Sequence, residues 1–145
     1  MKRLICLAAA FMCLVSCFDE QGLIVNPPSQ LVGYQWYTNE TDDETGEEYI
    51  CLWDFTAAEK CIYFVYFDSI EDLTLIPQYT FHSYYALPYV CHKKADTWIL
   101  TVDDGDNTAY YFSDIKTHSA HVSTLDGYEN NLTRCGVKVT PIPYD

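Results

Sequence analysis

The chain has 145 residues, of which 49% are apolar and 16% aromatic, and its formal net charge is −13 at pH 7. The high aromatic content excludes an intrinsically disordered chain, and the length suits one domain. Because so acidic a protein is repelled by phosphates, we expect no nucleic-acid partner.

Residues 1–16 are predicted to be a cleaved export signal. Lys2 and Arg3 precede the unbroken apolar run 4–15, which has the length of a signal-peptide core. It is too short for a transmembrane helix, which needs about 20 apolar residues. Removing residues 1–16 takes away two of the eight basic residues and none of the 21 acidic ones, so the mature chain is more acidic still.

The sequence Leu14-Val15-Ser16-Cys17 resembles the lipobox of bacterial lipoproteins. The resemblance implies that a peptidase cuts before Cys17 and that this thiol carries a diacylglyceryl lipid, with acyl chains such as palmitate. Two or more acyl chains hold a protein stably on a bilayer. We therefore expect lipidation at Cys17 and an outer-membrane protein of the cell envelope, on the periplasmic face or the cell surface. The alternative is an ordinary secretory signal with an incidental cysteine.

Residues 17–30 are predicted to form a tether between the lipid and the domain, because Asn26-Pro27-Pro28-Ser29 forbids a helix and favours extended chain. Residues 31–145 are predicted to form a single all-β domain. Its segments are rich in β-branched and aromatic residues and are separated by turn signals such as Asp126-Gly127, as in an antiparallel meander that forms a barrel or sandwich. The expected strands are 31–38, 48–56, 60–68, 78–87, 89–93, 97–102, 108–115, 120–125 and 131–139, with one helical turn at 69–73.

A hairpin tip at residues 58–59 fixes a register for two of these strands. It pairs Trp53 with Phe64 and Cys51 with Tyr66, on one face of the sheet. The predicted strand 60–68 is apolar on both faces, as expected for a strand that is covered on both sides. In the predicted strands 97–102 and 108–115, aromatic side chains also point to both faces of the sheet. They either line a pocket or form an aromatic core with hydroxyl groups at its rim, and we favour the core.

Four cysteines remain after the anchor: Cys51, Cys61, Cys91 and Cys135. In an oxidising compartment they allow three pairings, among which the sequence does not choose. Cys51 and Cys61 fall on opposite faces and should not bond each other. The alternative is four buried free thiols. The absence of a Cys-x-x-Cys motif argues against a zinc ribbon or a thioredoxin-like site.

Four short stretches of the domain resemble the small lipocalin-like lipoproteins of Gram-negative bacteria. The resemblance covers most of residues 31–139 and implies an antiparallel meander that closes into a small β-barrel with room for an apolar ligand. It implies no catalytic residue. The stretches are Leu31-Val32-Gly33-Tyr34-Gln35-Trp36, Leu52-Trp53-Asp54-Phe55-Thr56, Tyr84-Tyr85-Ala86-Leu87-Pro88-Tyr89-Val90 and Leu132-Thr133-Arg134.

No catalytic, metal or cofactor motif is apparent in the sequence, so we predict no enzyme, no metal site and no cofactor. His118 and His121 point to opposite faces of a strand and do not chelate one metal together. Six acids between Glu40 and Glu48 are predicted to be a mobile, solvated hairpin tip that binds calcium weakly if at all.

Two functions follow. The first is a membrane-anchored binding module whose barrel holds a small apolar or aromatic ligand. The alternative is a non-catalytic structural or interaction protein of the outer membrane, with a filled barrel and an outer face that meets an envelope protein. An open interior lined by tyrosine and tryptophan favours the first, and an exposed aromatic patch favours the second.

Overall fold

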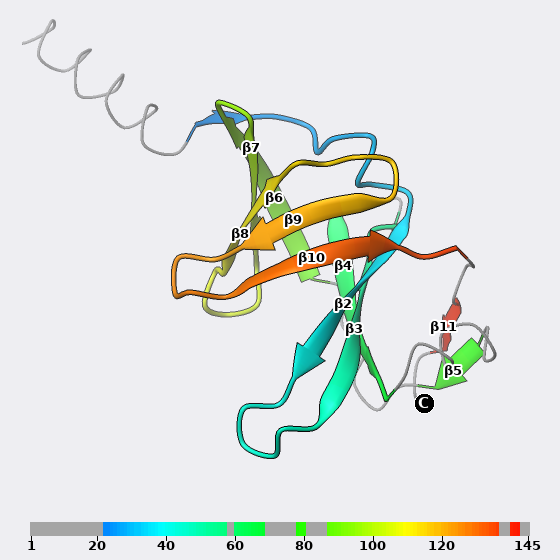
Figure 1. Ribbon diagram of the computed structural model, residues 1–145. Coiled ribbons are helices and arrows are strands. Elements are labelled where there is room, and N and C mark those ends of the chain that lie inside the picture. Colours follow the sequence, from blue (N-terminus) through cyan, green and yellow to red (C-terminus); the bar gives the residue numbers. More distant parts are fainter. Residues whose placement is uncertain (1–21, 58–59, 69–77, 81–86, 137–139, 143–145) are drawn as a thin grey trace, which may run out of the picture.

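The computed structural model describes residues 22–57, 60–68, 78–80, 87–136 and 140–142. The predicted signal peptide, Cys17, the hairpin tip at 58–59 and the helical turn at 69–73 lie outside these residues. Figure 1 shows the strands, which are β1 (Leu23–Ile24), β2 (Gln35–Thr41), β3 (Glu48–Asp54), β4 (Cys61–Phe67), β5 (Gln78–Thr80), β6 (Leu87–Lys94), β7 (Thr97–Val102), β8 (Ala109–Ser113), β9 (Ser119–Ser123), β10 (Glu129–Arg134) and β11 (Thr140–Ile142).

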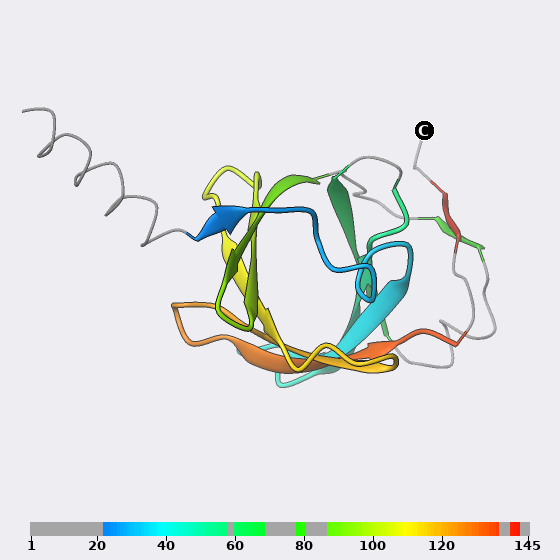
Figure 2. The ribbon, with the colours of Figure 1, turned by 90° about the horizontal axis from the view of Figure 1, so that it is seen from above.

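The main sheet is an antiparallel meander that curls on itself, as Figure 2 shows. β2, β3, β4, β6, β7, β8, β9 and β10 each pair with the next, and β10 pairs with β2. Two of these junctions are short: β4 meets β6 through two residue pairs, and so does β10 with β2. The predicted all-β antiparallel meander is confirmed, and the described residues contain no helix long and apolar enough to cross a membrane.

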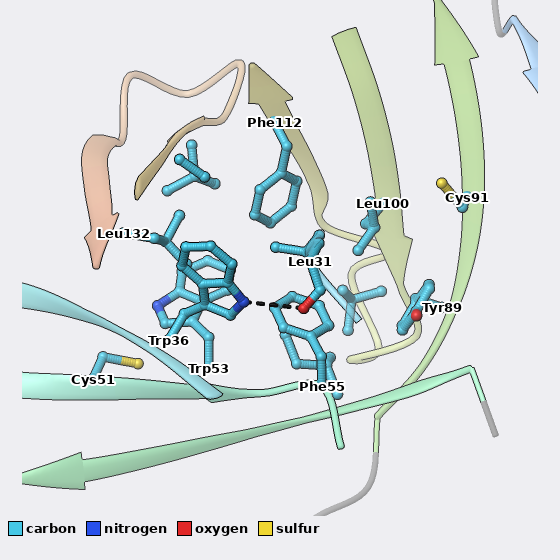
Figure 3. Close-up of a cluster of buried hydrophobic side chains, with 14 residues drawn as sticks. Leu31, Trp36, Cys51, Trp53, Phe55, Tyr89, Cys91, Leu100, Phe112 and Leu132 are labelled. Atoms are coloured by element: carbon cyan, nitrogen blue, oxygen red, sulfur yellow. Dashed lines mark hydrogen bonds between the residues drawn. The ribbon is translucent and has the colours of Figure 1, made fainter. Parts of the chain in front are cut away.

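Alternation along the strands places the core inside the curl. Trp36, Leu100, Phe112 and Leu132 come from four different strands, and each is at most 1% exposed. They belong to one buried cluster, part of which Figure 3 shows. The predicted register of β3 and β4 is confirmed, because Trp53 lies opposite Phe64 and Cys51 lies opposite Tyr66.

A turn, not a strand, closes one end of the barrel. The backbone N–H groups of Leu31 and Val32 donate to the carbonyl of Pro28, and Gly33 has a φ of 82°, which suits glycine. Trp36 Nε1 donates to the Leu31 carbonyl over 3.0 Å (Figure 3). The strand predicted from residue 31 therefore begins at Gln35, because the turn folds Leu31 inward as a plug.

The chain before this turn also lies against the barrel. Leu23 and Ile24 pair with β6 opposite Lys93 and His92, and Val25 N–H donates to the carbonyl of Cys91. The described part of the segment expected as a tether, residues 22–30, thus follows the barrel wall, as Figure 1 shows. Any free tether is shorter than the sequence suggests.

A second buried cluster lies on the outer face of β3 and β4. It comprises Ile50, Leu52, Val65 and Phe67, with Tyr37 packed against it. The short parallel ladder of β5 and β11 lies outside the barrel on this side in Figures 1 and 2. β4 therefore has buried residues on both faces, Ile62 on the inner and Val65 and Phe67 on the outer, as its composition predicted, while Tyr66 near its end is 61% exposed. β5 is shorter than the predicted strand 78–87, whose residues 81–86 lie outside the described part, and Leu87 belongs to β6.

Candidate functional site

The end of the barrel opposite Leu31 is hollow. The cavity has a volume of about 370 Å³. Its lining comes from β2, β3, β4 and β8, from the start of β6, and from the loops after β7 and β9. These are the inward-facing positions of each strand, so the cavity continues the core toward solvent.

Aromatic rings form the floor of the cavity. Trp53 meets Phe64 with ring centroids 4.8 Å apart at 76°, and it meets Tyr110 at 5.1 Å and 81°. Its Nε1 donates to the Thr38 hydroxyl over 3.1 Å. Its ring centroid lies 6.0 Å from that of Phe112. The indole is 2% exposed. It is therefore fixed by packing and by a hydrogen bond before any ligand arrives.

Four tyrosines form the walls: Tyr49, Tyr66, Tyr110 and Tyr128. Burial raises the pKa of Tyr110 to about 12, and partial desolvation also raises the pKa of Tyr66, although its side chain is 61% exposed. Burial and the nearby Glu40 carboxylate raise the pKa of Tyr128 well above its usual value. At neutral pH the walls are thus uncharged phenols, which combine an apolar ring with a hydroxyl group.

Three carboxylates complete the lining. Glu40 Oε1 accepts hydrogen bonds from the Tyr128 hydroxyl at 2.6 Å and from the Thr38 hydroxyl at 2.5 Å. Asp104 and Asp126 lie in the loops at the mouth. Among the described residues that line the cavity, none is basic. The polar part of the site is therefore negative.

Cys51 also lines the cavity, but it is a poor nucleophile. Burial raises the pKa of its thiol far above the usual value, so the reactive thiolate is scarcely populated. All four cysteines of the described residues are free thiols: Cys51 and Cys91 are buried in the barrel core, and Cys61 and Cys135 are partly exposed. Of the two alternatives left by the sequence, the structure has the free thiols.

A second hollow, of about 580 Å³, lies on the outside of the barrel over β6, β7 and β8. Its walls include Ile24, Val90, Ile99 and Tyr111. Ile24 is 69% exposed and Val90 47%. This outer hollow is larger than the inner cavity and mainly apolar, but its lining contains no tryptophan or phenylalanine.

Glu40 is the residue that sequence reasoning misplaced. It was expected in the solvated acidic tip, but it is the third inward position of β2 after Trp36 and Thr38 and points into the cavity. Alternation along the strand places Glu40 on the same face as Trp36, and this signal could have located it. The rest of the tip is an exposed hairpin turn as predicted, held by Asp42, whose Oδ1 accepts from the backbone N–H groups of Glu44 and Thr45.

The histidines do not form a common site. His121 Nε2 lies 3.2 Å from Glu129 on the outer surface of β9, and His118 lies in the loop before that strand. In the part of the chain that the structure describes, no three His, Cys, Asp or Glu side chains are arranged to hold a metal ion.

Comparisons of this chain with protein-family models, with curated proteins and with solved structures gave no match.

Proposed function

We propose that the domain is a binding module that holds a small apolar or aromatic ligand in the open end of its barrel. The inner cavity carries this proposal. Its volume of about 370 Å³ falls in the range of about 300–1,000 Å³ that small-molecule sites occupy, and such sites combine apolar walls with a few fixed polar groups. Trp53 supplies the floor here, Tyr110 belongs to the walls, and Glu40 supplies the polar group.

We also propose that the protein is a lipoprotein of the cell envelope, attached to the outer membrane through Cys17 and without catalytic activity. The residues Leu14-Val15-Ser16-Cys17 support the anchor. The up-and-down meander is the architecture of lipocalin barrels, which supports a lipocalin-like domain. In this proposal the barrel samples ligands at the membrane surface, to which the acyl chains confine it.

The outer hollow favours a second candidate, an interaction protein whose outer face meets an envelope protein. Exposed Ile24 and Val90 border it, and exposed apolar patches mark interaction sites. The inner cavity argues for the first candidate, because an interaction protein needs no hollow interior.

Two matched threonines separate the candidates: Thr124 lines the inner cavity and Thr101 lines the outer hollow. We expect saturation-transfer NMR on the full chain to detect binding of indole, a water-soluble aromatic probe. Thr124→Trp should abolish the signal by filling the cavity, and Thr101→Trp should leave it unchanged. Loss in Thr101→Trp alone would favour the outer face, and a signal that neither change affects would contradict the inner site.

A further inference from the structure

We propose that the ligand of the inner cavity is an organic cation, an amine or quaternary ammonium group on a small apolar body. This inference rests on the proposed function and names the chemical class of the ligand. It comes from the juxtaposition of two features in one cavity: an aromatic floor and a carboxylate, Glu40, that reaches it from β2.

Three aromatic rings of the cavity lining lie in contact with one another. Trp53 stands at 76° to Phe64 and at 81° to Tyr110, while Phe64 and Tyr110 are tilted by 44° at 5.9 Å. With centroids 4.8–5.9 Å apart, they leave no room for a guest between them, so a ligand lies over the side of the rings that faces the cavity. A quaternary ammonium group over an aromatic ring is attracted by the ring's negative face.

Glu40 supplies the counter-charge. Thr38 and Tyr128 both donate to its Oε1, which leaves Oε2 without a protein partner among the described residues. Two hydroxyl donors hold the carboxylate in place. A neutral ligand leaves this half-buried charge without a counter-ion, whereas a cation pairs with it.

The negative electrostatic potential of the cavity disfavours an anionic ligand. Burial first, and then the negative charge of Asp104, raises the pKa of Tyr110 to about 12. Glu40 likewise contributes, after burial, to the raised pKa of Tyr49. The same negative potential that keeps these phenols protonated repels an anionic ligand. Asp104 and Asp126 at the mouth attract cations mainly during encounter, because exposed charges affect association rates more than affinity.

The test uses three probes of nearly equal shape: choline, its uncharged analogue 3,3-dimethyl-1-butanol, and the anion 3,3-dimethylbutanoate. Binding to the full chain is measured by NMR titration. We expect choline to bind best and the anion worst. Glu40→Gln should weaken choline binding about tenfold, a loss of about 1.4 kcal/mol, because it removes the charge that pairs with the cation in a partly desolvated site, and should leave the alcohol unchanged.

Glu40→Gln preserves shape, since its amide oxygen still accepts from Tyr128. Glu48→Gln is the matched control: it removes the same charge from an exposed position of β3 outside the cavity lining. Tyr110→Leu is the second variant, and it should weaken choline more than the alcohol because it removes a ring but keeps apolar volume. Equal binding of choline and the alcohol, with no effect of Glu40→Gln on either, would contradict a cationic ligand but would leave the proposed binding module intact.

If none of the three probes binds although indole does, the proposal of a cationic ligand is wrong. If indole fails as well, the proposed function fails with it.

Discussion

Trp36 does two things at the filled end of the barrel. Its indole is fully buried, and its N–H fixes the turn that brings Leu31 inward. The side chain thus joins the core to the closure of that end.

We predict that Trp36→Ala lowers the free energy of unfolding by about 3–5 kcal/mol, the usual cost of deleting a large buried aromatic side chain. Urea denaturation measures it. Trp98→Ala is the control, because Trp98 is only partly buried, and it should cost less. Equal midpoints for Trp36→Ala and the wild type would show that the indole is not part of the core.

The cysteines give a second prediction at this scale. Burial raises the pKa of Cys91 to about 11 and that of Cys135 to about 12, so few thiolates are present near neutral pH. We expect iodoacetamide to modify Cys51 and Cys91 far more slowly in the folded protein than in urea. Mass spectrometry gives the number of cysteines that iodoacetamide has modified in each state. If unfolding without a reductant leaves any of the four described cysteines unmodified, a disulfide is present.

Glu40 shows where residue-scale prediction failed. Five of the eight residues that follow it in sequence are acidic, and charge density alone suggested a solvated tip. The alternation of side chains along β2 decides the position of Glu40, because every second residue of a strand points to the same face whatever the charge of the residues near it in sequence. Asp104 and Asp126 could not be assigned to the cavity at all, since only the closed sheet brings their loops beside Glu40.

At the scale of elements, local signals were sufficient for the β3–β4 hairpin. Alternation and a tip at 58–59 gave the observed pairing of Trp53 with Phe64. They were insufficient for the turn at Leu31 and for β1, because both depend on distant partners: the core that receives Leu31 and the edge of β6 that pairs with Leu23.

The β2–β3 turn depends on one carboxylate. Hydrogen bonds from Thr45 and Glu44 hold the pKa of Asp42 below 3.8. A lowered pKa in the fold means that this contribution to order is present above about pH 3.8 and is lost as the pH falls through the lowered value. We predict that the protection of the Thr45 and Gly46 amides against exchange, relative to their intrinsic rates, falls in that acid range and, in Asp42→Ala, at neutral pH as well.

The control for this prediction is Asp43→Ala. Asp43 is the exposed neighbour, and these hydrogen bonds end on Asp42 rather than on it. Exchange that is equally fast in both variants would show that the Asp42 bonds do not order the turn.

For the whole molecule, the anchor decides where the barrel works. We predict that Cys17→Ala gives an uncleaved or soluble protein, because the residue that accepts the lipid is lost. Detergent phase partitioning measures the change, with Cys135→Ala as a control that keeps Cys17. Equal membrane retention of Cys17→Ala and the wild type would refute lipid attachment.

The barrel is filled at one end by Leu31 and its neighbours and open at the other, where the cavity lies. The core needs Trp53 as packing, and the cavity uses the same indole as its floor. A ligand that sits on this floor therefore meets a surface that is already ordered, and little ordering entropy opposes its binding.

Amide chemical-shift mapping with indole tests this account most directly, because it reports on the inner cavity and the outer hollow in one experiment. We predict that the largest shifts fall at Glu40, Tyr49 and Tyr110, around the open end. The amides of Val90 and His92, beside the outer hollow, should move little. Shifts concentrated at Val90 and His92, or no shifts at saturating indole, would contradict the claim that the open end of the barrel is a ligand site.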